Sequence, residues 1–470
     1  MGSASQVQNA ERKSFCVNEV CFDAIQRKAK QIRNNISISS PDLDGRNRIL
    51  YVSESGDDGA DGLSPKNAWK TIQKVNGSAR NGDAVLFQCG GKWRGSLEAR
   101  DGALYSHYGE GELPILCGSK RDYADPALWE STTVACIYRC TERLNNVGII
   151  AFDHDGSLGN YNAKFATTVA VEGKKEYGLQ DLKRDLYFWN DRNSGELFLY
   201  SEKGNPGTRF RSIEIGEGKT VIGLTGNNIV VDGLRVQYSG NFGISSGDIS
   251  GATVKNCIVE WIGGSQNGAV GGSVYGNGIQ LYGSVTDCVL ENNWCYQCFD
   301  TGITIQYAGR KEEKVMENVS ISDNLVEYCH WGIEYYNLSE TGRFADIRID
   351  HNLIRFNGMG WGEVDRLPMC NGNTYLAEQT ASLCCFGIKD DSENVFVREN
   401  ILQLSNPGSL IRVDNVGFTA AKYEGNRLIQ KRGALLAKLG KDRYFCNEKD
   451  AQSFFERIGD DICQLCITDD

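Results

Sequence analysis

Asp300, His330 and Glu334 are the residues of this sequence whose types and spacing could move protons in one site. Two carboxyl groups can serve as acid and base when a glycosidic bond is broken, and a nearby histidine can orient one of them or the substrate. Asp300 could instead cap a turn, while Glu334 and His330 could be ordinary polar residues on a solvated face. Which reading holds depends on the register of the elements that carry them.

A recurring Gly-Ile pair supplies that register between residues 216 and 430. The spacings 302 − 278 = 24 and 332 − 302 = 30 residues, with short β-type runs between the pairs, indicate a solenoid of β-coils. Asparagines near the corners suit left-handed turns and can stack in ladders: Asn256, Asn292, Asn324, Asn352 and Asn400. The pairs stand at Gly243-Ile244, Gly278-Ile279, Gly302-Ile303, Gly332-Ile333 and Gly387-Ile388.

In stacked coils, residues of equal register would form columns, with successive residues of one column about 4.8 Å apart. With the isoleucines facing inward, we expect the glycines to leave a groove one side chain deep that suits a pyranose ring. Asp300 and His330 would stand on one bank and Glu334 on the other. The side chains expected to bind substrate there are Gln280, Thr304, Lys389 and Arg412 in one column, Gln306, Tyr282 and Tyr336 in the next, and Trp331 and Trp361 as stacking faces.

The loop over residues 359–384 could close over this groove. Its segment "GMGWGEVDR" contains Glu363 and Arg366, so it could add a carboxylate that the coil register does not reveal.

Two reactions and one non-catalytic role remain open. Hydrolysis would pair Asp300 with Glu334, whose Cα atoms we expect to lie roughly 13 Å apart, so that leaning side chains would reach the separation of an inverting glycosidase. β-Elimination on a uronate would instead use His330, Lys389 or Arg412 near the α-proton. A non-catalytic glycan-binding module would need none of these groups.

The N-terminal part carries a resemblance. The order "YVSESGDDGADGLSPKNAWKTIQKVN", "GDAVLFQCGGKWRG", "YGEGELPI" resembles pectate-lyase-like right-handed parallel β-helix proteins, in particular a bacterial carbohydrate-active branch, over about residues 49–430. The resemblance implies an all-β parallel β-helix and an oligo- or polysaccharide substrate, but not which reaction. It also implies a glutamate where this chain has Gln280.

We therefore expect a β-helix with a helical segment at each end and a β-rich insertion within the chain. The predicted parts are an N-terminal helical extension (1–48), a first β-helix section (49–111), a β-rich insertion (112–215), the main β-helix (216–432) and a C-terminal helical cap (433–470). The helices are expected within 17–36 and in "NEKDAQSFFERIGDDICQL", where a helix would cover the open end of the solenoid.

Composition limits the partners. A net charge of −11 over 470 residues disfavours nucleic acid and anionic membranes, and disfavours a polyanionic substrate unless a local basic cleft overrides it. No apolar run reaches the roughly 18 residues of a membrane span. The sequence leaves the oligomeric state undetermined.

The cysteines and the acidic loop bear on metals and compartment. The 17 cysteines lack zinc-site spacing and are expected to be free buried thiols, so no metal site is predicted. The loop "SGDDGADG" could bind calcium, although a solvated turn is favoured. Free thiols and an N-terminus without an apolar signal segment favour a cytoplasmic location, with a secreted or periplasmic one as the alternative.

Overall fold

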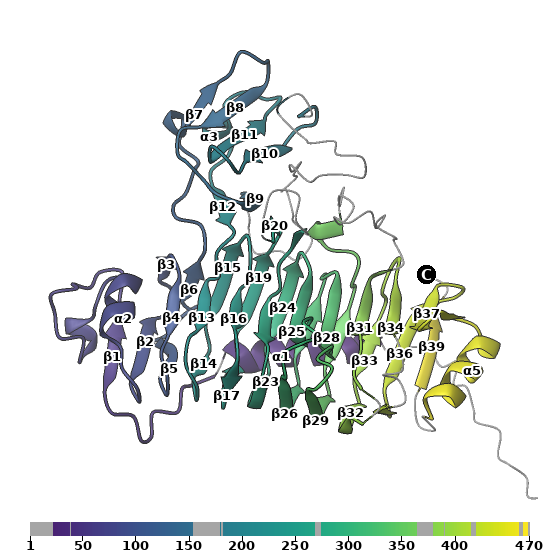
Figure 1. Cartoon of the computed structure of the whole chain (residues 1–470). Helices are drawn as coiled ribbons and strands as arrows, with labels where there is room; N and C mark the ends of the chain where they lie inside the picture. Colours follow the sequence, from purple (N-terminus) through teal and green to yellow (C-terminus); the bar gives the residue numbers. More distant parts are fainter. Residues whose placement is uncertain are drawn as a thin grey trace, which may run out of the picture.

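The computed structural model is a long parallel β-helix with an insertion standing off one side (Figure 1). The chain winds repeatedly through three sheets, and nearly every strand pairs in parallel with the strand one coil later. The all-β right-handed parallel β-helix predicted from the repeat and the resemblance is confirmed. The structure describes residues 22–37, 39–153, 179, 182–267, 274–363, 379–389, 391–414, 420–459 and 464–468.

We name the three sheets A, B and C. Sheet A contains β1 (Ile49–Val52), β2 (Ala84–Gln88), β5 (Leu104–Tyr108), β14 (Val230–Asp232), β18 (Thr253–Lys255), β23 (Val285–Glu291), β26 (Val315–Ser322), β29 (Arg343–Asp350), β32 (Glu393–Arg398) and β35 (Ala421–Glu424), with β17 (Ile249–Ser250) beside β23. Sheet B contains β3 (Lys92–Arg94), β6 (Ile115–Cys117), β15 (Arg235–Ser239), β19 (Ile258–Ile262), β24 (Trp294–Cys298), β27 (Leu325–Glu327), β30 (Leu353–Arg355), β33 (Ile401–Gln403), β36 (Arg427–Lys431) and β39 (Gln464–Thr468).

Sheet C carries the Gly-Ile pairs. It contains β4 (Leu97–Ala99), β13 (Ile222–Leu224), β16 (Ile244–Ser246), β22 (Ile279–Tyr282), β25 (Thr301–Tyr307), β28 (Trp331–Asn337), β31 (Ala381–Cys385), β34 (Ser409–Val413), β37 (Leu435–Leu439) and, antiparallel at the end, β38 (Asp442–Phe445).

An apolar column inside sheet C fixes the register of the coils. Ile244, Ile279, Ile303 and Ile333 pair in succession, as the spacing predicts, and all are fully buried. The next member is Leu383 rather than Ile388, because Ile333 pairs with Leu383 on β31. The predicted register is therefore right for four coils and wrong for the fifth.

The glycines beside these residues do not form an outer groove. A Cβ on Gly302 would meet Val326 Cγ1 at 2.4 Å and the carbonyl oxygen of Gly332 at 3.0 Å, both inside the coil. A Cβ on Gly332 would likewise meet Ile354 Cγ2 at 2.3 Å. The glycines thus let the chain turn the corner into sheet C against a filled interior, and the predicted glycine-lined groove is wrong.

A buried asparagine ladder holds the corners between sheets A and B. Its members are Asn293, Asn324, Asn352, Asn400 and Asn426, each donating from its side chain to the next along the axis. Asn352 Nδ2 also donates to the Ile321 carbonyl at 2.9 Å, and its Oδ1 accepts from the Asn324 backbone amide at 3.0 Å. Asn324, Asn352 and Asn400 are ladder members as predicted, whereas Asn256 and Asn292 form a separate, half-buried pair.

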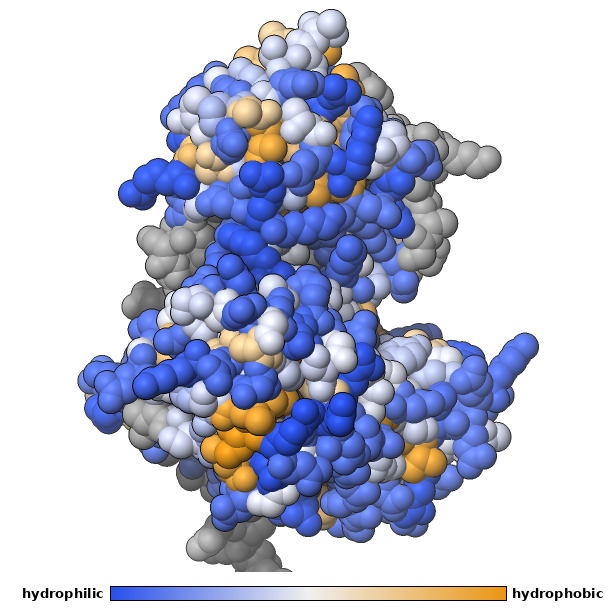
Figure 2. Space-filling view, turned by 90° about the vertical axis from the view of Figure 1, so that its left-hand side faces the viewer, coloured by the Kyte–Doolittle hydropathy of each residue, from blue (hydrophilic) through white to orange (hydrophobic). Residues whose placement is uncertain are grey.

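The insertion is a small β-unit. Four antiparallel strands form it, β7 (Trp129–Ser131), β8 (Ile137–Cys140), β10 (Phe188–Asp191) and β11 (Glu196–Tyr200), and the antiparallel pair β9 (Val147–Phe152) and β12 (Ile213–Glu217) joins it to the coil. The short helices η2 (Pro126–Leu128) and α3 (Pro206–Arg209) belong to it, and the small hairpin β20 (Ser265–Gln266) and β21 (Val274–Tyr275) extends from the coil. Since β6 still pairs within sheet B, the coil continues past residue 111. Seen from the N-terminal end, the surface is mostly hydrophilic and the insertion rises above the coil (Figure 2).

Helices lie at the ends and on one flank. The first, α1 (Phe22–Ser37), buries Ile25, Ala29 and Ile32 against sheet B. Near the first coil, η1 (Pro65–Asn67) and α2 (Ile72–Ser78) follow the acidic loop. At the other end α5 (Glu448–Ile458) is capped by Asn447, but β37 and β39 continue the coil through the predicted cap region.

The ladder predicts a large stability difference between two asparagines. Asn352→Ala removes the partners of the Ile321 carbonyl and the Asn324 amide in a buried place, so we expect the free energy of unfolding to fall by about 3 kcal/mol in urea titration. The matched control is Asn318→Gly, at an exposed position with φ of 54° whose Nδ2 donates to Asp287. There we expect about 0.5 kcal/mol or less. Equal losses in the two variants would contradict a structural role for the buried ladder.

Candidate active site

The candidate site lies on the outer face of sheet C, around β25 and β28. Backbone pairing places Gln280, Thr304, Glu334, Cys384 and Arg412 in one outward column. The prediction is right for four members of this column. Cys384 stands where Lys389 is predicted, because the register shifts at the fifth coil.

Glu334 is a buried carboxyl group with a strongly raised pKa. Glu334 is 2% exposed. Its Oε2 accepts hydrogen bonds from Thr304 Oγ1 at 3.0 Å and from Thr301 Oγ1 at 3.4 Å. Burial, and then the negative charge of Asp300, raise the pKa of Glu334 to about 8 against the two hydroxyls and Arg412. At neutral pH this side chain therefore holds a proton that it can give away.

Asp300 combines a turn role with a place in the cluster. Its carbonyl accepts from the backbone amides of His330 at 2.9 Å and Trp331 at 3.2 Å, so it joins two coils at the corner. Its carboxylate charge contributes to the raised pKa of Glu334, and also to those of Tyr336 and Tyr275, both raised chiefly by burial. The charge of Asp300 thus acts on these three groups, and its backbone carbonyl joins two coils at the corner.

His330 is paired with a carboxylate from the segment that follows β30. His330 is 1% exposed, and its Nδ1 lies 2.7 Å from Oε1 of Glu363 on η4 (Trp361–Glu363). The loop thus brings Glu363 to the site, while Arg366 lies outside the described residues.

Trp361 anchors this loop instead of presenting a face to a sugar. Trp361 is 1% exposed. Its Nε1 donates to the Gln297 carbonyl at 2.7 Å, and its backbone amide donates to Gln297 Oε1 at 2.8 Å. The ring also packs on Phe299. The predicted stacking role of Trp361 is therefore wrong, because the core already covers the indole.

The other predicted aromatic residues are placed on the outer face. Trp331 is nearly buried, donates to the Gln379 carbonyl at 2.7 Å and packs edge-on against Phe386. Tyr282, Gln306 and Tyr336 form the second outward column as predicted, and Phe386 meets Tyr336 edge-on at 5.3 Å. Tyr336 thus stands two strand positions beyond Glu334.

A network of amides surrounds the Thr304 side of the cluster. Gln280 Oε1 accepts from Asn277 Nδ2 at 2.6 Å and from Gln306 Nε2 at 2.7 Å. Asn277 in turn accepts from the Thr301 amide at 3.0 Å. Gln280 is therefore held in one orientation as a neutral polar group beside Thr304.

The two predicted basic residues differ in position. Lys389 donates to the Gly342 carbonyl at 3.0 Å, after the end of β31, so its predicted place in the outward column is wrong. Arg412 lies in the column but is bound to Asp414, with Nη2 2.8 Å from Oδ2.

The sequence interpretation missed Asn277, Thr301, Tyr275 and Phe386. Thr301 adjoins Asp300 in the sequence, and Phe386 would follow from the corrected register. Tyr275 comes from the hairpin β20–β21, for which the repeat gives no signal.

The next observations concern metal binding and membrane spans in the described residues. Within the described ranges, no group of three His, Cys, Asp or Glu residues is placed to hold a metal ion. In the acidic loop, Asp58 accepts from Thr71 and from two backbone amides ahead of α2, as a capping residue does. Of the described helices, none is long and apolar enough to cross a bilayer.

The fold and the site together define a parallel β-helix protein with a buried carboxyl cluster on one outer face. No protein-family model and no curated protein matches the chain. Among solved structures, it is similar to a protein described as a glycoside hydrolase (10% identity, 90% of this chain and 96% of that one, TM-score 0.49). It is also similar to XylC in complex with xylose (12%, 83% and 70%, 0.49) and to pectate lyase Pel9A (10%, 86% and 72%, 0.43). Likeness at this level carries no conclusion about activity.

The Glu334 proton predicts a pH-dependent stability. The folded protein keeps this proton up to pH about 8, whereas the unfolded chain releases it near 4.5, so the folded state binds more protons between these values. Its contribution therefore makes the free energy of unfolding fall as pH rises through this window, by about 1.4 kcal/mol per pH unit. We expect Glu334→Gln to remove that slope, so that urea titrations at pH 5, 6.5 and 8 show a growing advantage over the wild type.

The control for this measurement is Glu291→Gln, a half-buried glutamate on β23 in sheet A. Its stability curve is expected to run parallel to that of the wild type. A Glu334→Gln curve that also stays parallel to the wild type would show that Glu334 ionises normally in the folded protein.

Proposed function

We propose that this protein is a carbohydrate-active enzyme that hydrolyses glycosidic bonds, with Glu334 as general acid and Asp300 as general base. The observation that carries the proposal is the buried Glu334 carboxyl, protonated at neutral pH and facing the charge of Asp300. Two nearby carboxyl groups in different protonation states are what acid–base cleavage of an acetal requires.

Each group has a defined part in the reaction. Glu334 gives its proton to the glycosidic oxygen as the bond to the anomeric carbon breaks, and Asp300 takes a proton from the water whose oxygen attacks that carbon. The products are two free hydroxyl-bearing sugars, Glu334 is left as carboxylate and Asp300 is left protonated, and proton exchange with solvent restores both.

The spacing of the two groups favours inversion. They stand on neighbouring coils, where Asp300 lies at the corner before β25 and Glu334 pairs with Thr304 inside that strand. The 3.4 Å contact of Glu334 with Thr301, the residue after Asp300, means that its carboxyl leans back toward Asp300. This orientation of the Glu334 side chain supports a separation of about 6.5–9.5 Å between the two carboxyl groups, which leaves room for a water molecule, as in inverting enzymes.

The supporting residues have matching roles. Thr301 and Thr304 hold the Glu334 carboxyl by their hydroxyls, and the Glu363 contact fixes the His330 ring against the corner that carries Asp300. β-Elimination has less support, because Lys389 lies outside the cluster and the Arg412 charge is taken up by Asp414.

Substitution of the two carboxyl groups tests the proposal. We expect Glu334→Gln and Asp300→Asn each to lower kcat/KM by about 10²–10⁴-fold, because general acid and base catalysis contribute on that scale. The measurement is a panel of aryl glycosides and defined oligosaccharides, first screened with the wild type, with Glu291→Gln as the control that keeps full activity. Wild-type activity that survives both changes would assign the reaction to other residues, and unsaturated products absorbing in the ultraviolet would indicate elimination. A wild type inactive on the whole panel would favour a glycan-binding module.

Product stereochemistry tests the pairing of Asp300 with Glu334. Proton NMR of the first product formed from an active glycoside is expected to show the anomer opposite to the substrate, since water attacks directly from the Asp300 side. Retention of configuration would require a covalent intermediate and would rule out this assignment of roles.

A further inference from the structure

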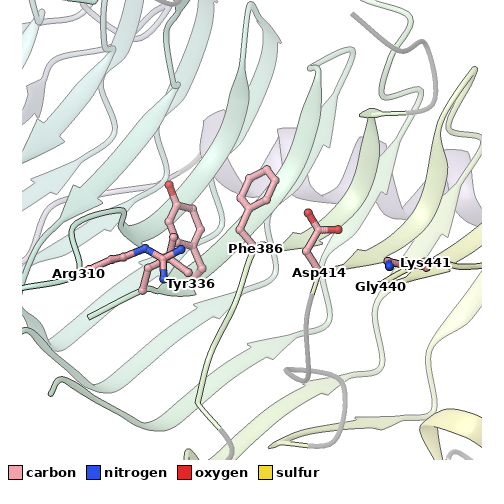
Figure 3. A pocket seen from close by; sticks show the side chains of 7 residues that line it. Arg310, Tyr336, Phe386, Asp414, Gly440 and Lys441 are labelled. Carbon is pink, nitrogen blue, oxygen red and sulfur yellow. The ribbon is translucent and has the colours of Figure 1, made fainter. Parts of the chain in front are cut away.

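A trough lies on the outer face of sheet C, and Figure 3 shows the side chains that line it. Its volume is about 470 Å³, within the usual range of small-molecule sites of about 300–1,000 Å³. Tyr336, Phe386 and Asp414 fall at the same register of three successive coils, and Gly440 follows on the fourth. The trough therefore runs along the coil axis for about 14 Å, three coil spacings.

Tyr336 is the wall shared by the trough and the cluster. It follows Glu334 by two positions on the same face of β28, about 7 Å along the strand. Burial raises the pKa of Tyr336 well above its usual value, and the charges of Glu334 and Asp300 add to that. A sugar lying in the trough would thus be joined directly to one held over Glu334.

The trough is locally basic on an acidic protein. Arg310, in the turn after β25, and Lys441, in the turn after β37, both line it and are exposed, and Figure 3 places them at its opposite ends. Among the described residues, neither side chain has a carboxylate partner. Of the described lining residues, the acidic one is Asp414, and it is paired with Arg412. Two unpaired cations therefore face a concave surface on a chain of net charge −11.

We propose that this trough is a second sugar subsite, adjoining the cleavage site, and that it selects a sugar unit carrying an anionic substituent. Tyr336 and Phe386 supply apolar surface for the sugar rings, and Arg310 and Lys441 pair with the carboxylate or sulfate. This inference rests on the proposed function, because it makes the substrate of the Glu334 site an acidic oligosaccharide.

The test measures binding without turnover, in full-length Glu334→Gln protein. Isothermal titration compares two matched pairs of probes: digalacturonate with galactobiose for a carboxylate, and 6′-sulfated lactose with lactose for a sulfate. We expect at least one anionic probe to bind about tenfold more tightly than its neutral partner, with the advantage lost at 0.5 M NaCl. Which pair shows it identifies the anionic group.

Arg310→Gln/Lys441→Gln in the same background is expected to abolish that advantage and leave neutral-probe binding unchanged. The control is Lys422→Gln, an exposed lysine on sheet A that should retain it. Anionic probes that bind no better than neutral ones, or an advantage that persists in the double variant, would overturn the subsite. Neither result bears on whether Glu334 and Asp300 cleave a glycosidic bond, which the activity panel decides separately.

Discussion

Parallel pairing between successive coils is the constraint from which the site follows. Each coil places its residues about 4.8 Å from those of the next, so side chains far apart in the sequence meet in columns. Glu334 reaches Thr304 and Thr301 only because Thr304 is its direct partner on the preceding strand. The same pairing aligns Tyr336, Phe386 and Asp414, and the buried asparagine ladder keeps the corners from slipping.

Within that frame, Asp300 and Glu334 stand in different surroundings. Asp300 contributes its backbone to the corner, whereas Glu334 lies in the middle of a strand, 2% exposed and bonded by two threonine hydroxyls. Burial, and then the nearby charge of Asp300, make ionisation of Glu334 unfavourable, so Glu334 keeps its proton. Above the ordinary glutamate pKa, the folded protein loses stability because Glu334 keeps a proton that the unfolded chain releases.

How far the sequence predicts this arrangement depends on how regular the coils are. The spacings of 24 and 30 residues locate Asp300, His330, Glu334 and Tyr336 correctly, because no long loop intervenes. The next coil is longer, since Leu383 pairs with Ile333 across 383 − 333 = 50 residues, and Gly387-Ile388 then gives a false match. The column requires an apolar inward side chain, which Leu383 supplies, while Ser382 stands where the earlier coils have glycine. Contacts made by loops, such as that of Glu363 with His330, leave no periodic signal in the sequence. The sequence does, however, identify the loop itself as a candidate.

The global charge of −11 and the local charge of the trough point in opposite directions, and distance decides between them. At physiological salt, exposed charges are screened within about 8 Å, so a ligand in the trough is governed by Arg310, Lys441 and the paired Asp414 rather than by the rest of the surface. The net negative charge acts earlier, on approach, and slows the encounter with long polyanions more than with short ones. Under the proposed subsite, an acidic surface around a basic trough would favour short acidic oligosaccharides over extended polyanionic chains.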